Sequence, residues 1–178
     1  RGEQAEVALR LWMALKPRLP FSRVATVYET MERPLVPVLA AMEAHGVRVD
    51  RAALSRLSGD FAQRMAALED EIQTLAGEKF NVGSPKQLGE ILFDRLGIPG
   101  GEKGKTGAYG TGADILEDIT TLEDSHPQGA RLAARLLDWR QIAKLKSTYT
   151  DALQLAINPD TDRVHTSYSI AGANTGRL

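Results

Sequence analysis

The chain has 178 residues, and its 43% hydrophobic content is enough for a domain with a real core. It lacks cysteine, which excludes disulfides and thiolate metal sites and favours an intracellular compartment. Its net charge of −1 argues against a histone-like binder, and no apolar run approaches the length of a membrane span. We therefore expect a soluble, cytoplasmic protein with no membrane partner.

The first third of the chain predicts helices. Apolar residues at helical spacing predict one helix over 3–15 and a second over 22–45. Pro34 and Pro37 lie inside the second, where we expect a kink or break. Gly46 is placed to end it in the left-handed conformation.

A long amphipathic helix follows over 51–76, with Asp50 as its N-cap. Its apolar stripe is typical of a long antiparallel helix pair, and we interpret residues 22–76 as a stalk. The stripe consists of Leu54, Leu57, Phe61, Met65, Leu68, Ile72 and Leu75.

Ser84 as N-cap, Pro85 at the first helical position and Gly97 after the last turn define a shorter helix. Free N–H groups at its start, beside Lys86, suit an anion. Ordinary helix capping is the alternative explanation of the same residues.

Six glycines within 98–112 predict a mobile loop, and Thr111 with Asp114 predicts the cap of a short helix over 113–121. The Gly104-Lys105-Thr106 sequence suggests a phosphate-binding loop of nucleotide hydrolases. That motif requires glycine where Pro99 stands, and no apolar strand leads into the loop, so we reject this interpretation.

Two interpretations of this loop remain. It binds a phosphate of a nucleic-acid backbone without being a nucleotide site, or it is an unstructured surface loop. The residues suited to phosphate are Lys103, Lys105, Thr106 and Tyr109.

Pro127 starts a long helix that contains residues 138–149. On a regular helix Arg140, Lys144, Ser147 and Thr148 share one face. Two cations and two hydroxyls in a line suit the phosphates of a nucleic-acid backbone, and a solvated helix surface is the alternative.

The distribution of charge supports the first of these interpretations. Residues 79–112 carry five basic and three acidic side chains, and residues 131–150 carry five basic and one acidic. We expect the fold to bring these two stretches together into one patch.

Near the end of the chain a turn is predicted over 158–162 and a strand over 163–168. It is the first clear strand, and no partner for it is evident in the sequence. We therefore expect the fold to continue beyond Leu178.

Several segments in fixed order resemble the family of bacterial DNA polymerase I, the family A DNA polymerases. They are residues 33–39 (RPLVPVL), 45–47 (HGV), 80–82 (FNV), 84–88 (SPKQL), 144–149 (KLKSTY), 164–168 (VHTSY) and 175–178 (TGRL). The resemblance covers nearly the whole chain.

The resemblance implies a mainly α fold: a long antiparallel helical stalk with a mobile glycine-rich tip, followed by a short β segment that begins the palm. Residues 1–20 would end the 3′–5′ exonuclease-like domain, 21–150 would form the thumb, and 151–178 would start the palm. The partners it implies are double-stranded primer–template DNA and the remaining palm, fingers and exonuclease-like domain.

The resemblance also implies which residues meet the DNA backbone. These are Asn81, Ser84, Lys86, Lys103, Lys105, Thr106 and Thr111 at the tip, and Arg140, Lys144, Ser147 and Thr148 on the long helix. Arg177 would reach the minor groove, whose acceptors are shared by all base pairs.

No catalytic residue is expected within this chain, since the metal-binding palm aspartates and the fingers of the family follow the TGRL motif. Mg²⁺ is expected in the complete polymerase, and the chain alone is expected to bind DNA without extending a primer. Gln4 stands where the family's exonuclease domain has a metal-binding aspartate, and an amide is a poorer ligand for a hard cation, so no metal site is expected there.

Two other functions are left as hypotheses. A helical protein-interaction scaffold would use the 51–76 stripe, and complete burial of that stripe would remove the idea. A phosphate-loop hydrolase ranks last.

Overall fold

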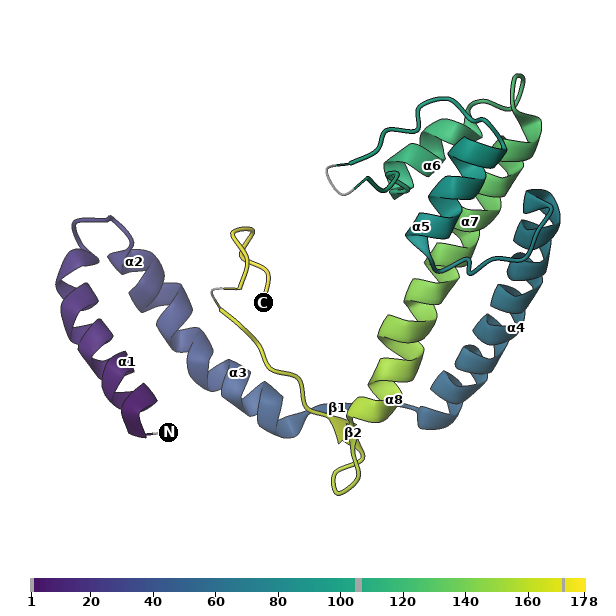
Figure 1. Cartoon of the computed structure of the whole chain (residues 1–178). Helices are drawn as coiled ribbons and strands as arrows, with labels where there is room; N and C mark the ends of the chain where they lie inside the picture. The colour runs from purple at the N-terminus through teal and green to yellow at the C-terminus, as the bar shows by residue number, and fades with distance from the viewer. Residues whose placement is uncertain (1, 105–106, 171) are drawn as a thin grey trace. The chain divides into compact units, whose positions relative to one another are not determined.

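The computed structural model describes residues 2–104, 107–170 and 172–178, so the predicted contact residues Lys105 and Thr106 lie outside the described part. The chain divides into two compact units (Figure 1). One is Asp50–Ala156, and the other combines Arg1–Val49 with Ile157–Leu178. The predicted domain limits at 20 and 150 differ from this division, and the assignment of thumb and palm stays a prediction.

The first unit is built on two antiparallel helices, α4 (Arg51–Ala76) and α7 (Pro127–Leu145). Their contacts run in opposite order along the two helices. Ser58 Oγ donates to Asp151 Oδ1 at 2.6 Å just beyond the end of α7, and Trp139 Nε1 donates to Glu69 Oε1 at 3.0 Å further along. The predicted antiparallel pair is confirmed, with α7 as the partner of α4. Residues 22–49 belong to the other unit, so the interpretation of residues 22–76 as one stalk was wrong.

The stripe of α4 faces α7 but is only partly covered. Ile72 is fully buried, most of the other six residues are half-buried, and Leu57 is 46% exposed. Packing against α7 within the same chain therefore explains the amphipathic pattern of α4. Because the stripe is not completely buried, the scaffold hypothesis is not removed.

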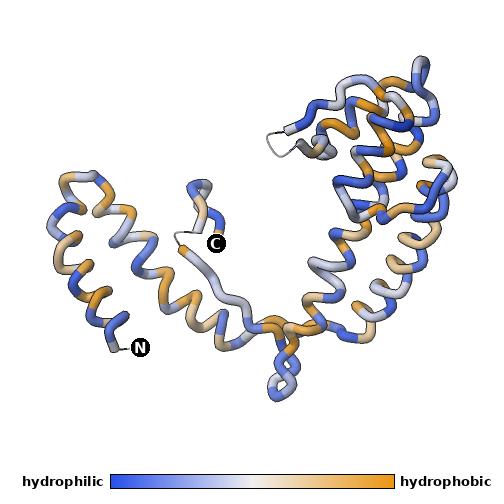
Figure 2. Tube along the Cα trace, viewed as in Figure 1, coloured by the Kyte–Doolittle hydropathy of each residue, from blue (hydrophilic) through white to orange (hydrophobic). Residues whose placement is uncertain are grey.

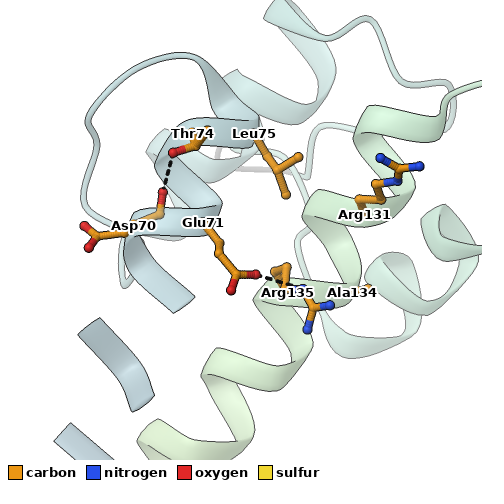
Figure 3. Close-up of a pocket in the computed structure, with 7 residues that line it drawn as sticks. All are labelled: Asp70, Glu71, Thr74, Leu75, Arg131, Ala134 and Arg135. Atoms are coloured by element: carbon orange, nitrogen blue, oxygen red, sulfur yellow. Dashed lines mark hydrogen bonds and ion pairs between the residues drawn. The ribbon is translucent and has the colours of Figure 1, made fainter. Parts of the chain in front are cut away.

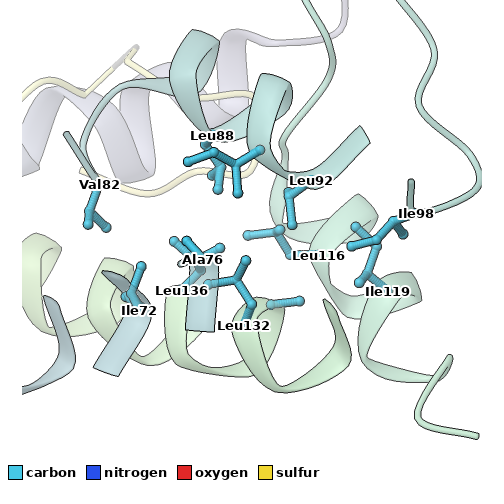
Figure 4. Packing of buried hydrophobic residues seen from close by; sticks show 12 residues of the cluster. Ile72, Ala76, Val82, Leu88, Leu92, Ile98, Leu116, Ile119, Leu132 and Leu136 are labelled. Atoms are coloured by element: carbon cyan, nitrogen blue, oxygen red, sulfur yellow. The ribbon is translucent and has the colours of Figure 1, made fainter. Parts of the chain in front are cut away.

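The core gathers at one end of the pair, where α5 (Pro85–Gly89) and α6 (Ala113–Thr120) pack on the helices (Figure 4). A π-helical segment, Glu90–Arg95, continues α5 without a break. Each fully buried aliphatic side chain contributes about 1.5–3 kcal/mol. The largest such side chains are Ile72, Leu88, Leu92, Leu116, Leu132 and Leu136.

Local capping signals confirm most of the predicted helix limits in this unit. The Asp50 side chain accepts from the Ala53 N–H at 2.9 Å, and Ser84 Oγ accepts from the Gln87 N–H at 3.5 Å. Gly97 follows the last turn at a φ of 62°, as predicted.

The predicted cap of α6 is wrong. Gly112 occupies the N-cap position without any side-chain cap, while Thr111 is buried, with 7% of its surface exposed. Thr111 is instead held by Arg140, as described below.

After α7 the chain forms a π-helical segment, Lys146–Asp151, and a short helix, α8 (Ala152–Ala156). The regular α-helical spacing assumed for residues 138–149 therefore ends at Leu145. The wider turn changes the angle at which the later side chains leave the helix, so Ser147 and Thr148 are not at the positions of a regular helix.

In the second unit, α1 (Gly2–Leu15) is followed by a 3₁₀ turn, Lys16–Arg18, and by α2 (Ala25–Val27). A π-helical segment, Tyr28–Glu32, leads directly into α3 (Arg33–His45). Along these helices hydrophobic and hydrophilic residues alternate (Figure 2).

The predicted break at the prolines is not found: a π-helical segment lies just ahead of Pro34, and α3 continues through Pro37. The Arg33 N–H bonds to the carbonyl of Tyr28, five residues back. Gly46 ends α3 at a φ of 66°, but its ψ of −179° lies outside the left-handed helical region, which corrects the predicted conformation.

A small antiparallel sheet in this unit has the order β1-β3-β2. Its strands are β1 (Val47–Arg48), β2 (Ile157–Asn158) and β3 (Arg163–Val164). Val164 pairs with Val47 on one side and Ile157 on the other. The expectations of a six-residue strand and of a missing partner were both wrong, whereas the turn over 158–162 is confirmed by the Asp162 N–H bond to the Asn158 carbonyl.

Candidate nucleic-acid interface

The end of the glycine-rich loop lies against α7. The Arg140 guanidinium donates to the carbonyl oxygen of Thr111 and, at 3.4 Å, to its hydroxyl oxygen. Burial lowers the pKa of Arg140, but an arginine remains charged in proteins. The two cationic stretches predicted from the sequence therefore meet at this contact.

This arrangement gives Arg140 a structural task in addition to any contact with DNA. Its guanidinium carries five N–H donors, and the Thr111 contact engages two of its nitrogens. The other N–H groups are not engaged by Thr111. Thr111 itself is buried, and its hydroxyl oxygen accepts from Arg140. In this structure the predicted contact of Thr111 with a phosphate would therefore require its hydroxyl to become accessible.

Lys144 lies one turn further along α7 and is exposed, as are Ser147 and Thr148 in the π-helical segment. Among the residues that the structure describes, the hydrogen bond of the Ser147 hydroxyl is a long one of 3.5 Å, to the Lys144 carbonyl. Of the predicted face, these three side chains are the ones presented to solvent.

The neighbouring Lys146 is used differently. Its ammonium pairs with Asp151 at 2.7 Å, and this bond, together with that from Ser58, holds the pKa of Asp151 below its ordinary value. Lys146 therefore ties the end of α7 to α4 through Asp151.

At the start of α5, capping explains the arrangement of Asn81 and Ser84. The Asn81 side-chain oxygen accepts from the Gly83 N–H at 2.9 Å, and the Ser84 oxygen accepts from Gln87. Both bonds use acceptor atoms only, which leaves the Asn81 amide N–H₂ and the Ser84 O–H as donors. With the exposed ammonium of Lys86 they make a set of donors suited to an anion.

The glycine-rich loop folds back on itself and onto the π-helical segment after α5. Lys103 and Tyr109 form an isolated antiparallel bridge, and the Gly104 N–H donates to the Ala108 carbonyl at 2.8 Å. The Tyr109 hydroxyl donates to Asp94, and this bond raises the pKa of Tyr109. These contacts were missed by the sequence reasoning, because nothing in the local pattern pairs Tyr109 with residues of the preceding helix.

A hollow of about 370 Å³ lies beside this loop. Its lining combines two lysines, Lys86 and Lys103, with two acids, Glu90 and Asp94. Two of the predicted contact residues, from separate segments, are thus brought to one place, although the acids reduce the local positive charge.

The larger hollow between α4 and α7 has a different character (Figure 3). Its wall includes an ion pair of Arg135 with Glu71 at 3.1 Å, and Arg135 also binds Asp138 at 2.9 Å. Because the Arg135 guanidinium is paired with two carboxylates, this wall does not suit a polyanion.

Arg177 belongs to the other unit and is exposed. The segment that leads to it is held by Glu43, whose carboxylate accepts from the Tyr168 N–H at 2.6 Å and whose carbonyl bonds His165 at 2.8 Å. Gln4, also in this unit, is exposed on α1.

Within residues 2–104, 107–170 and 172–178, no three His, Asp or Glu side chains gather into a metal site. Over the same residues, no helix has both the length and the hydropathy needed to cross a bilayer.

Comparison with known proteins identifies the family. The profile of DNA polymerase family A matches residues 51–178. DNA polymerase I of Rhizobium leguminosarum is 58% identical over 177 residues, which cover 99% of this chain and 17% of that protein. The chain belongs to DNA polymerase family A.

Other relatives agree. DNA polymerase I of Pseudomonas aeruginosa is 45% identical over 99% of the chain and 19% of its own length, and the thermostable DNA polymerase I of Thermus aquaticus is 44% identical over 99% and 21%. The family A chain thus spans about a fifth of the length of these relatives.

The fold is shared with a solved structure of the same family. The POL domain of Pol1 from M. smegmatis, in complex with DNA primer-template and dNTP, superposes with a TM-score of 0.80 at 35% identity. The match covers 96% of this chain and 29% of that one. The predicted mainly α fold and family are confirmed.

Proposed function

We propose that this chain is the primer–template-binding segment of a DNA-directed DNA polymerase that acts in replication and repair. The observation that carries the proposal is the contact of Arg140 with Thr111, which joins the glycine-rich loop to the cationic side of α7. The M. smegmatis relative is described in complex with primer–template, which supports the same role here.

The binding would be electrostatic and independent of sequence. Exposed donors at the loop, at the start of α5 and along α7 neutralise phosphates, and each neutralised phosphate releases counterions. Lys105, Thr106 and Arg177 are included in this proposal on the strength of the family resemblance. The tip's mobility and the reach of Arg177 into the minor groove are further parts of the proposal.

We further propose that residues 1–20 end the exonuclease-like domain, 21–150 form the thumb and 151–178 begin the palm. On this proposal the chain alone does not extend a primer. The Mg²⁺ chemistry of nucleotidyl transfer then belongs to palm residues of the complete polymerase, which this chain would serve by holding the duplex.

The test uses Lys144→Ala, with Arg131→Ala as the matched control. Both residues are exposed on α7, but Arg131 lies outside the predicted face. Lys144→Ala should weaken binding to all duplex sequences alike and reduce the slope of log K against log salt by about 1, whereas Arg131→Ala should leave the slope unchanged. Equal effects of the two substitutions would count against this face of α7.

A further inference from the structure

We propose that Tyr109 is a positioning residue that docks the glycine-rich loop on the helix continuing α5 and thereby fixes Lys103 for contact with duplex DNA. The inference rests on the proposed function and adds to it the part of the chain that holds the loop in place. Three independent contacts of the Tyr109 side chain support it.

The first two contacts join the loop to the helix. The Tyr109 ring packs on the Phe93 ring at a centroid distance of 4.9 Å and an angle of 42°. The Tyr109 hydroxyl donates to the carboxylate of Asp94, the next residue of the same helix. The ring is therefore held at its face and at its polar end, which defines both its position and its orientation.

The third contact lies within the loop and reaches the cation. The Lys103 ammonium is 4.5 Å from the centroid of the Tyr109 ring, and the backbones of the two residues bridge. An ammonium is attracted electrostatically to the negative face of an aromatic ring. This attraction restrains the lysine without burying it, since Lys103 remains exposed to an incoming phosphate.

Two glycines make this close packing possible. A β-carbon placed on Gly89 would lie 2.7 Å from Tyr109 Cβ, and one on Gly101 would lie 2.5 Å from Phe93 Cγ. Neither position has room for a side chain while the loop is docked. The glycine content of this segment thus includes positions that packing requires.

The hydroxyl of Tyr109 also affects the charge around Lys103. Asp94 and Glu90 line the same hollow as Lys103, and either carboxylate could compete with DNA for the ammonium. By donating a hydrogen bond to Asp94, the Tyr109 hydroxyl satisfies part of that carboxylate's hydrogen-bonding capacity. Lys103 is left associated with the neutral ring, an easier partner for a phosphate to replace.

The experiment is a double-mutant cycle on the affinity of the chain for one fixed DNA duplex. Tyr109→Ala should weaken binding by about 3- to 10-fold, because a loop that is docked only part of the time binds more weakly in proportion to that fraction. Tyr109→Phe keeps the ring contacts and should stay within about 2-fold of the original affinity.

Non-additivity is the decisive result. If Tyr109 acts through Lys103, Tyr109→Ala in a Lys103→Ala background should produce little further loss. Losses that multiply would overturn the inference, as would an unchanged affinity for Tyr109→Ala. If Tyr109→Ala does not fold, the cycle is run with Tyr109→Leu, which keeps an apolar side chain of similar size but loses the aromatic face near the Lys103 ammonium. The same non-additivity with Lys103→Ala is expected, and multiplying losses would again refute the inference.

Amide exchange gives a second readout that needs no DNA. The Gly104 N–H, which bonds the Ala108 carbonyl, should exchange faster in Tyr109→Ala than in the unmodified chain, and an unchanged rate would contradict docking. Failure of the unmodified chain to bind any duplex would refute the proposed function, whereas duplex binding with multiplying losses would refute only the role of Tyr109.

Discussion

The two ends of the α4–α7 pair are held together by different forces. At the end near α5 and α6, fully buried aliphatic side chains such as Leu132 and Leu136 form a continuous core. At the other end Leu57 is exposed, and the polar set of Ser58, Asp151 and Lys146 joins the helices. The candidate DNA-binding loop is attached to the well-packed end, so its contact residues are held on the more stable part of the helix pair.

The largest effect expected from this comparison is on stability. Leu132→Ala at the packed end should lower the free energy of unfolding by about 2–5 kcal/mol, because it removes fully buried methyl groups and leaves a cavity. Leu57→Ala at the other end should cost much less, since its side chain is 46% exposed. Urea unfolding measures both variants, and equal losses would show that the two ends are packed alike.

A smaller effect is expected at the polar end, and it depends on pH. Because the folded state lowers the pKa of Asp151, this carboxylate stabilises the fold above its unfolded pKa, about 3.9, and loses that contribution as the pH falls through the folded value. The thermal midpoint of Asp151→Asn should therefore lie below that of the unmodified chain at neutral pH. The difference should shrink as both are acidified below pH 4, and a difference independent of pH would contradict the assignment.

The smallest effect is expected at the contact of Thr111 with Arg140. Thr111→Val removes only the long 3.4 Å bond to the hydroxyl, and the bond to the backbone carbonyl remains. Duplex affinity should change by less than 2-fold, because a hydrogen bond of this length contributes little free energy. Arg140→Lys, which cannot reproduce the fork of donors, should weaken duplex binding more than Thr111→Val. The reverse order would show that the hydroxyl is the important partner.

The sequence predicted what short-range chemistry determines. Asp50 and Ser84 cap their helices through bonds to N–H groups three residues ahead, so the signal and its partner lie together in the sequence. The same capping signal was present at Thr111, but the predicted cap does not form there. Arg140, 29 residues away, binds both the carbonyl and the hydroxyl of Thr111. A capping pattern cannot reveal such a competitor.

Pairing over long distances was likewise beyond the sequence pattern. Val47 and Val164 pair across more than a hundred residues, which explains why the last strand was expected to lack a partner. The π-helical segments have no residue signature that separates them from an α-helix, and they altered the predicted face beyond Leu145. Of the candidate site, the residue types were predictable, while the docking of Tyr109 on Phe93 and Asp94 required the fold.

The most direct test of the account is the salt dependence of binding to two duplexes of unrelated sequence. Electrostatic gripping of the backbone predicts equal affinities for both duplexes and a steep linear fall of log K with log salt, with a slope of about −0.9 for each phosphate contacted. A flat salt dependence, or a strong preference for one sequence, would contradict the claim that this chain holds the sugar–phosphate backbone of a duplex.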